Sequence, residues 1–179
     1  MLQRLILRLR YSAEEVVVLS ILIAIASMGR VLFVGIPSVQ PASFVIIMTG
    51  IYFGPKSGIV AGVLTAVLSN LFLGFGPWLP GQMAMWGGMG ALAGMFSWVL
   101  KKHTLYRYSF AFVWGFLFGW GMNAFMFRYF GSSSFFAACI ASIPLDLSHA
   151  LGNVAFLRLA GKRTRFSLLR IREKYGLFS

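Results

Sequence analysis

The 44 residues from Ser57 to Leu100 contain no Asp, Glu, Lys or Arg. As one straight helix this run would be about 66 Å long at about 1.5 Å per residue. That is roughly twice the thickness of a bilayer's hydrocarbon core, which is about 30 Å. The run therefore has to fold back on itself, and glycine and proline cluster at Gly74–Gly81, where we expect the turn.

The composition agrees with a membrane protein. Apolar residues make up 59% of the 179 residues and charged residues only 11%, against about a quarter in soluble domains. Four acidic and sixteen basic side chains are too few to cover the surface of a soluble domain of this length. The composition also argues against a disordered chain and, with a single cysteine, against a disulfide scaffold.

These patterns predict an all-α integral membrane fold, a bundle of six transmembrane helices. The second predicted helix is short and is expected to be tilted or partly re-entrant, and the last is long and contains Pro144 and Asp146, so a kink or an interfacial end is expected there. The predicted spans are Val16–Val34, Pro41–Phe53, Ser57–Leu73, Gln82–Leu100, Ser109–Phe127 and Phe135–Leu159.

The distribution of positive charge predicts the orientation. The formal net charge is +12, but the basic residues occur in short patches between neutral runs, which argues against nucleic-acid binding. With six spans, every Lys and Arg except Arg30 and Arg128 falls on the side of the two termini. Basic residues accumulate on the cytoplasmic side of membrane proteins. Both termini are therefore predicted to be cytoplasmic, in a multi-pass protein of a prokaryotic plasma membrane.

Three regions are predicted along the chain. Residues 1–13 form an amphipathic segment on the inner leaflet, 14–161 form the membrane domain, and 162–179 form a basic cytoplasmic tail. Ser12 and Glu15 have the spacing of a capping box, which predicts that the first span begins just after Ser12.

Several kinds of chemistry lack their motifs. The sequence has no G-x-x-x-x-G-K-[ST] motif for ATP, no G-x-S-x-G motif for a nucleophilic serine, and no Cys/His cluster at metal-ligand spacing. We therefore expect a chain that is not an enzyme and has no cofactor or metal of its own. Any energy for transport would come from another subunit or from an ion gradient.

Polar and aromatic residues gather in the outer half of the predicted bundle. Unpaired polar groups are costly in lipid, so a cluster on one side favours a water-accessible binding pocket. The alternative is that the tryptophans belong to an interfacial belt and the amides bridge helices. The predicted pocket residues are Arg30, Gln40, Asn70, Trp78, Gln82, Trp86, Asn123 and Arg128.

Asp146, His149 and Asn153 share one face of the sixth predicted helix. A proton relay, an acid–base pair of an intramembrane enzyme, and a ligand contact are possible roles. We favour a structural hydrogen-bonded network, in which Asp146 would pair with Arg30 or Arg128, because an intramembrane carboxylate needs a partner.

Small residues recur four positions apart, which lets helices approach closely. Most of these ridges are predicted to pack inside the chain, whereas Ser20 and Ala24 on the first span are predicted to form a docking surface for a partner. The ridges are Ser20/Ala24, Gly58/Gly62/Ala66, Gly87/Ala91, Gly90/Gly94 and Gly115/Gly119.

Five segments resemble a known family. They read ASMGR, IPSVQP, FGPKSG, SNLFLGFGPW and QM, at residues 26–30, 36–41, 53–58, 69–78 and 82–83. Together they are similar to the substrate-binding (S) component of energy-coupling factor (ECF) transporters, and most similar to the cobalamin branch. The resemblance is good over residues 15–100 and rests mainly on the six-span layout elsewhere.

The resemblance implies a vitamin-binding subunit of an ABC importer. Such a subunit captures its ligand at the outer face and delivers it inward with a transmembrane coupling (T) subunit and two cytoplasmic ATPases, and the family's docking motif on the first span falls here on Ser20 and Ala24. Cobalamin is the expected ligand, with Arg30 as a phosphate partner or a structural ion pair. The alternatives are riboflavin, a queuosine precursor or pantothenate as ligand, or a self-sufficient ion-coupled carrier. The expected cobalamin contacts are Gln40, Asn70, Trp78, Gln82 and Trp86.

Overall fold

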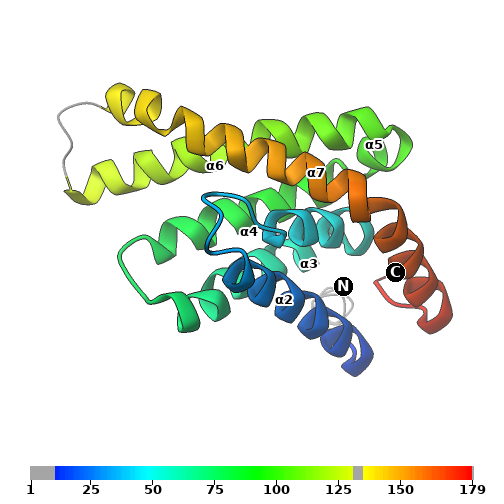
Figure 1. Cartoon of the computed structure of the whole chain (residues 1–179). Coiled ribbons are helices and arrows are strands. Elements are labelled where there is room, and N and C mark those ends of the chain that lie inside the picture. The colour runs from blue at the N-terminus through cyan, green and yellow to red at the C-terminus, as the bar shows by residue number, and fades with distance from the viewer. Residues whose placement is uncertain (1–10, 131–134, 179) are drawn as a thin grey trace, which may run out of the picture.

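A computed structural model describes residues 11–130 and 135–178 of the chain and confirms the all-α class (Figure 1). The predicted amphipathic segment 1–13 lies almost wholly outside the described residues. The helices are α2 (Ala13–Leu32), α3 (Ala42–Leu73), α4 (Leu79–Met95), α5 (Ser97–Lys102), α6 (Thr104–Phe130) and α7 (Phe135–Tyr175).

The helix boundaries differ from the predicted spans in three places. Helix α3 joins the second and third predicted spans, the fourth predicted span is divided between α4 and α5, and α7 continues through the basic residues of the expected tail. Within the described residues, four helices are long and apolar enough to cross a membrane, namely α2, α3, α6 and α7. The six-span count and the cytoplasmic termini stay predictions.

Helix α2 begins at the predicted capping box. The backbone N–H of Glu15 donates to Ser12 Oγ, and the backbone N–H of Ser12 donates to Glu15 Oε2. The other oxygen of the Glu15 carboxylate accepts a hydrogen bond from the backbone N–H of Phe178 at 2.6 Å. The first and last described segments of the chain are therefore joined at one end of the bundle.

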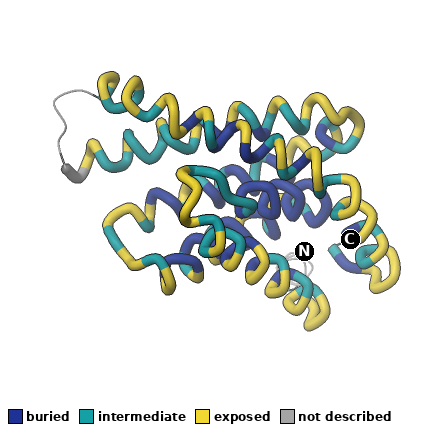
Figure 2. The backbone as a smooth tube through the Cα atoms, in the orientation of Figure 1, coloured by how far each residue is buried: buried dark blue, intermediate teal, exposed yellow. Residues whose placement is uncertain are grey.

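Gly54 divides α3 into two parts. Its φ of 89° lies in the left-handed region that favours glycine, and Pro55 follows it. Every residue of the first part, 42–53, is buried, in the middle of the molecule (Figure 2). A helix that is apolar on all sides belongs in such a place. The second part carries the chain back, so both parts lie against α4.

Close approach of α3 and α4 depends on glycine. A Cβ atom on Gly90 would overlap the backbone of Gly58, and one on Gly62 would overlap the backbone of Trp86. A Cβ on Gly50, from the first part of α3, would also overlap the Gly90 carbonyl. The predicted small-residue ridges are thus confirmed as internal packing in this helix pair.

The bundle has two distinct ends (Figure 1). One, which we call the loop end, carries the connections 33–41 and 74–78. The other, which we call the basic end, carries the α5–α6 connection at His103 and the described ends of the chain.

A kink or an interfacial end was predicted for the last span because it contains Pro144. In the structure, Pro144 lies inside the continuous helix α7.

Replacing Gly90 by alanine is expected to destabilise the fold. The added methyl group would force α4 away from Gly58 in the second part of α3, and overpacking of this kind costs about 1–3 kcal/mol. Thermal unfolding in detergent micelles measures the effect. Gly88→Ala is the matched control on the same helix, because a Cβ there meets no neighbour within 4 Å. This control should be neutral or more stable by up to about 1 kcal/mol, and equal destabilisation by both changes would contradict the packing argument.

Candidate functional site

Asn70 is the centre of a hydrogen-bonded cluster at the loop end. Its Nδ2 donates to Gln82 Oε1 at 2.7 Å and to the carbonyl of Ala66, one turn earlier, also at 2.7 Å. Its Oδ1 accepts from Trp78 Nε1 at 3.3 Å. Asn70 is 1% exposed and Gln82 is 9% exposed, so the last turn of α3 is tied to the first turns of α4 by buried amides.

The packing of α3 against α4 brings these amides within reach of each other. The two segments run antiparallel: Gly58 meets Gly90, and Gly62, four residues later on α3, meets Trp86, four residues earlier on α4. Side chains four residues apart share one helix face. One further step on each helix brings Ala66 beside Gln82, and a second brings Asn70 beside Trp78. The Asn70 amide therefore reaches Gln82 across one helical turn.

Arg30 and Trp86 form the second part of the site. Arg30 Nη1 donates to Ser69 Oγ at 2.7 Å, and the guanidinium carbon lies 5.1 Å from the ring centroid of Trp86. Such a cation over an indole face is attracted by the electrons of the ring. Trp86 is completely buried, and within the described residues its Nε1 has no hydrogen-bond acceptor. This indole N–H is therefore an unused donor.

These groups surround a cavity of about 230 Å³. The cavity lies between the end of α2, the connection 33–41, and residues of α3, α4 and α6. Arg30, Gln40, Gln82 and Trp86 line it directly, and Asn70 and Trp78 bond to the cluster behind Gln82. Six of the eight predicted pocket residues thus lie in or directly behind one cavity.

The two remaining predicted residues lie elsewhere. Asn123 on α6 donates from Nδ2 to Ser142 Oγ at 3.0 Å and lies close to the sulfur of Cys139. Arg128 is exposed in the last turn of α6 and does not line the cavity. Asn123 therefore belongs to the contact region of α6 and α7.

Two residues of the site, Phe118 and Ser69, are not among the predicted pocket residues. The Phe118 ring lies 5.2 Å from the Trp86 ring and lines the cavity, while Ser69 holds Arg30. Phe118 is one of eighteen phenylalanines and has no local signal that would single it out. Ser69 could have been predicted, because it directly precedes Asn70 and begins the SNLFLGFGPW segment that resembles the family.

The polar face of α7 takes part in internal hydrogen bonds. His149 Nε2 lies 2.9 Å from Ser43 Oγ, and Asn153 Nδ2 donates to the Ala111 carbonyl at 3.2 Å. The sequence predicted that Asp146 would pair with Arg30 or Arg128, and this is wrong. Asp146 instead accepts a hydrogen bond from Ser142 Oγ at 2.8 Å. The structural role is therefore supported with a different partner.

The arrangement is suited to binding. It combines amide groups, one cation, two aromatic faces and a free indole donor around a single cavity. In the described part of the chain, no three His, Cys, Asp or Glu side chains come together to hold a metal ion. Ser20 and Ala24 lie far along α2 from this cluster, on an exposed face of the helix.

Comparison with known proteins decides the family. A family model described as the substrate-specific component of ECF transporters matches residues 14–159. The chain belongs to this family. It is a multi-pass membrane protein and a transport subunit, not an enzyme.

The curated relatives are bacterial. A UPF0397 protein of Vibrio atlanticus is 29% identical over 99 residues, which cover 52% of this chain and 54% of that protein. UPF0397 proteins of two Aliivibrio fischeri strains are 30% identical over 130 residues, 64% of this chain and 70% of theirs. The chain thus spans about half of the length of the Vibrio relative. These names state no ligand, and no solved structure is significantly similar to the chain.

The Asn70–Gln82 hydrogen bond can be tested with a double-mutant cycle. Asn70→Ala and Gln82→Ala should each lower the free energy of unfolding in mixed micelles, and their effects should be coupled by about 0.5–3 kcal/mol because they remove one shared buried bond. The control cycle pairs Asn70→Ala with Asn123→Ala, which shares no bonding partner with Asn70. That cycle should be additive within about 0.5 kcal/mol. Additivity in the first cycle would argue against the cluster.

Proposed function

We propose that this chain captures a water-soluble vitamin in the loop-end cavity and passes it inward as part of a larger importer. The observation that carries the proposal is the set of polar groups left with spare bonding capacity around the cavity. The indole N–H of Trp86 has no acceptor among the described residues, and Arg30 is held by a hydroxyl rather than by a carboxylate. Buried donors of this kind favour a ligand with acceptor groups.

The proposed importer contains a coupling subunit and two cytoplasmic ATPases. The absence of a P-loop motif from these 179 residues fits a subunit that relies on other subunits for ATP hydrolysis. The loop end is proposed to face outward and the basic end to face the cytoplasm, in a topology of six spans, because positive charge favours the inner side. The exposed ridge of Ser20 and Ala24 on α2 is proposed as the docking surface for the coupling subunit.

Cobalamin is our proposed ligand, on the basis of the sequence resemblance. Its amides and its nucleotide-loop phosphate suit Gln40, Gln82 and Arg30. The cavity of about 230 Å³ lies below the range of about 300–1,000 Å³ common for pockets of small ligands. A corrinoid would therefore require the connection 33–41 to move outward. The size of the cavity as it stands favours a smaller vitamin such as pantothenate, which is the second candidate.

Equilibrium binding of the purified chain to a vitamin panel tests this proposal. The panel contains cobalamin, riboflavin, pantothenate and a queuosine precursor, and we expect saturable binding of cobalamin. Arg30→Gln should weaken that binding about tenfold or more, because it removes the cation at the cavity, whereas Arg128→Gln should change it by less than about twofold. Tenfold corresponds to about 1.4 kcal/mol.

Two results would count against different parts of the proposal. Tight binding of another vitamin without cobalamin binding would remove the ligand assignment and leave the capture function intact. Accumulation of the vitamin by the chain alone in liposomes, without ATPases, would contradict the role of a dependent subunit and favour an ion-coupled carrier.

A further inference from the structure

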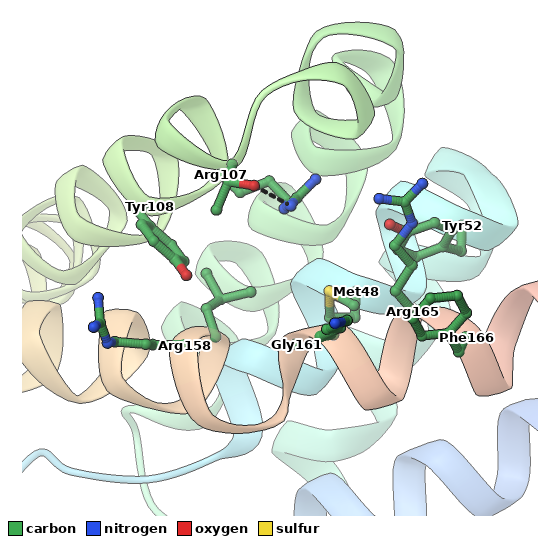
Figure 3. A pocket seen from close by; sticks show the side chains of 11 residues that line it. Met48, Tyr52, Arg107, Tyr108, Arg158, Gly161, Arg165 and Phe166 are labelled. Carbon is green, nitrogen blue, oxygen red and sulfur yellow. Dashed lines mark hydrogen bonds between the residues drawn. The ribbon is translucent and has the colours of Figure 1, made fainter.

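A second cavity, of about 290 Å³, lies at the basic end. Three helices contribute to it (Figure 3). Helix α6 provides Arg107 and Tyr108, α7 provides Arg158 and Arg165, and α3 provides Tyr52. This cavity is separate from the one assigned to the vitamin, because the two cavities share no lining residue.

Four cations line this cavity, and they have no carboxylate among them. Arg158, Lys162 and Arg165 share one face of α7, spaced by four and three residues, and Arg107 joins them from α6. None of the four acidic residues of the chain lines the cavity. The mutual repulsion of these cations is therefore not relieved by a side chain in the cavity, and an anion bound there would relieve it.

Arg107 is fixed in place before any ligand arrives. Its Nη1 donates to the carbonyl of Leu100 at 2.7 Å and to that of Lys101 at 3.3 Å, and its Nη2 donates to Thr104 Oγ1 at 2.9 Å. The last of these bonds is drawn in Figure 3. A preorganised cation of this kind binds at a lower entropic cost than a free side chain.

The buried hydroxyl of Tyr52 is an independent sign of a ligand. Tyr52 is only 2% exposed, and within the described residues its hydroxyl has no hydrogen-bond partner although it lines a cavity rich in donors. Buried hydroxyls without a partner are rare in folded proteins. An acceptor oxygen in the cavity would satisfy it, and Tyr108 adds a second phenol to the wall (Figure 3).

We propose that this basic cavity binds a phosphate group. Guanidinium groups and phenolic hydroxyls match the oxygens of a phosphate, and the space is sufficient for such a group together with several waters of about 30 Å³ each. The phosphate belongs either to the headgroup of an anionic phospholipid or to a free phosphate ion. Basic pockets between membrane helices suit the first source. The site acts independently of the vitamin cavity and of the identity of the vitamin.

Isothermal titration calorimetry of the full chain in neutral detergent at fixed salt tests this site. The probes are inorganic phosphate, dioctanoyl-phosphatidylglycerol and, as a zwitterionic comparison, dioctanoyl-phosphatidylcholine. The cavity variant carries Arg158→Gln, Lys162→Gln and Arg165→Gln together. The control variant removes the same charge from α7 outside the cavity, through Arg163→Gln, Arg170→Gln and Lys174→Gln.

We expect the cavity variant to bind at least one anionic probe about tenfold or more weakly, and the control variant to stay within about twofold. Tyr52→Phe keeps the ring and removes only the hydroxyl, so it should fold normally and weaken the same probe about threefold or more. Loss of phosphatidylglycerol binding alone would identify a lipid headgroup as the source, and loss of phosphate binding alone would identify the free ion. Equal losses in the two triple variants, or no binding of either anionic probe to the native chain, would overturn the proposal.

Discussion

The rest of the structure depends on the close approach of α3 and α4. Glycines at positions 58, 62 and 90 let the two backbones touch, and the left-handed turn at Gly54 returns α3 so that both of its parts reach α4. Because the contacts recur every four residues, the register that joins Gly58 to Gly90 brings Gln82 beside Ala66 at the loop end, one turn from Asn70, whose amide donates to both residues. Packing in the middle of the bundle thus determines the geometry of the proposed vitamin site.

Much of this could be predicted from the sequence because it depends on local signals. The uncharged run from Ser57 to Leu100 predicted helices that fold back, and the capping box predicted the start of α2. The cluster around Asn70 and Gln82 could also be predicted, because polar side chains in an apolar chain need partners and these two are only twelve residues apart.

Contacts between distant segments could not be predicted. Phe118 reaches the Trp86 ring from another helix, and nothing near it in the sequence distinguishes it from the other phenylalanines. The partner of Asp146 was predicted from charge, whereas packing of α6 against α7 left it bonded to Ser142 on its own helix. The basic cavity combines Arg107 with residues of α7 about fifty positions later, so the sequence showed only dispersed positive charge.

Labelling of intact cells tests most directly whether the proposed ligand-capturing end and the basic end lie on opposite faces of the membrane. Four variants in a Cys139→Ser background each carry one new cysteine. It replaces Gly35 or Phe75 at the loop end, or Lys102 or Arg163 at the basic end, and all four positions are exposed. An impermeant maleimide should label the loop-end cysteines in intact cells and the basic-end cysteines only after permeabilisation. The reverse pattern, or labelling of both ends from outside, would contradict the account.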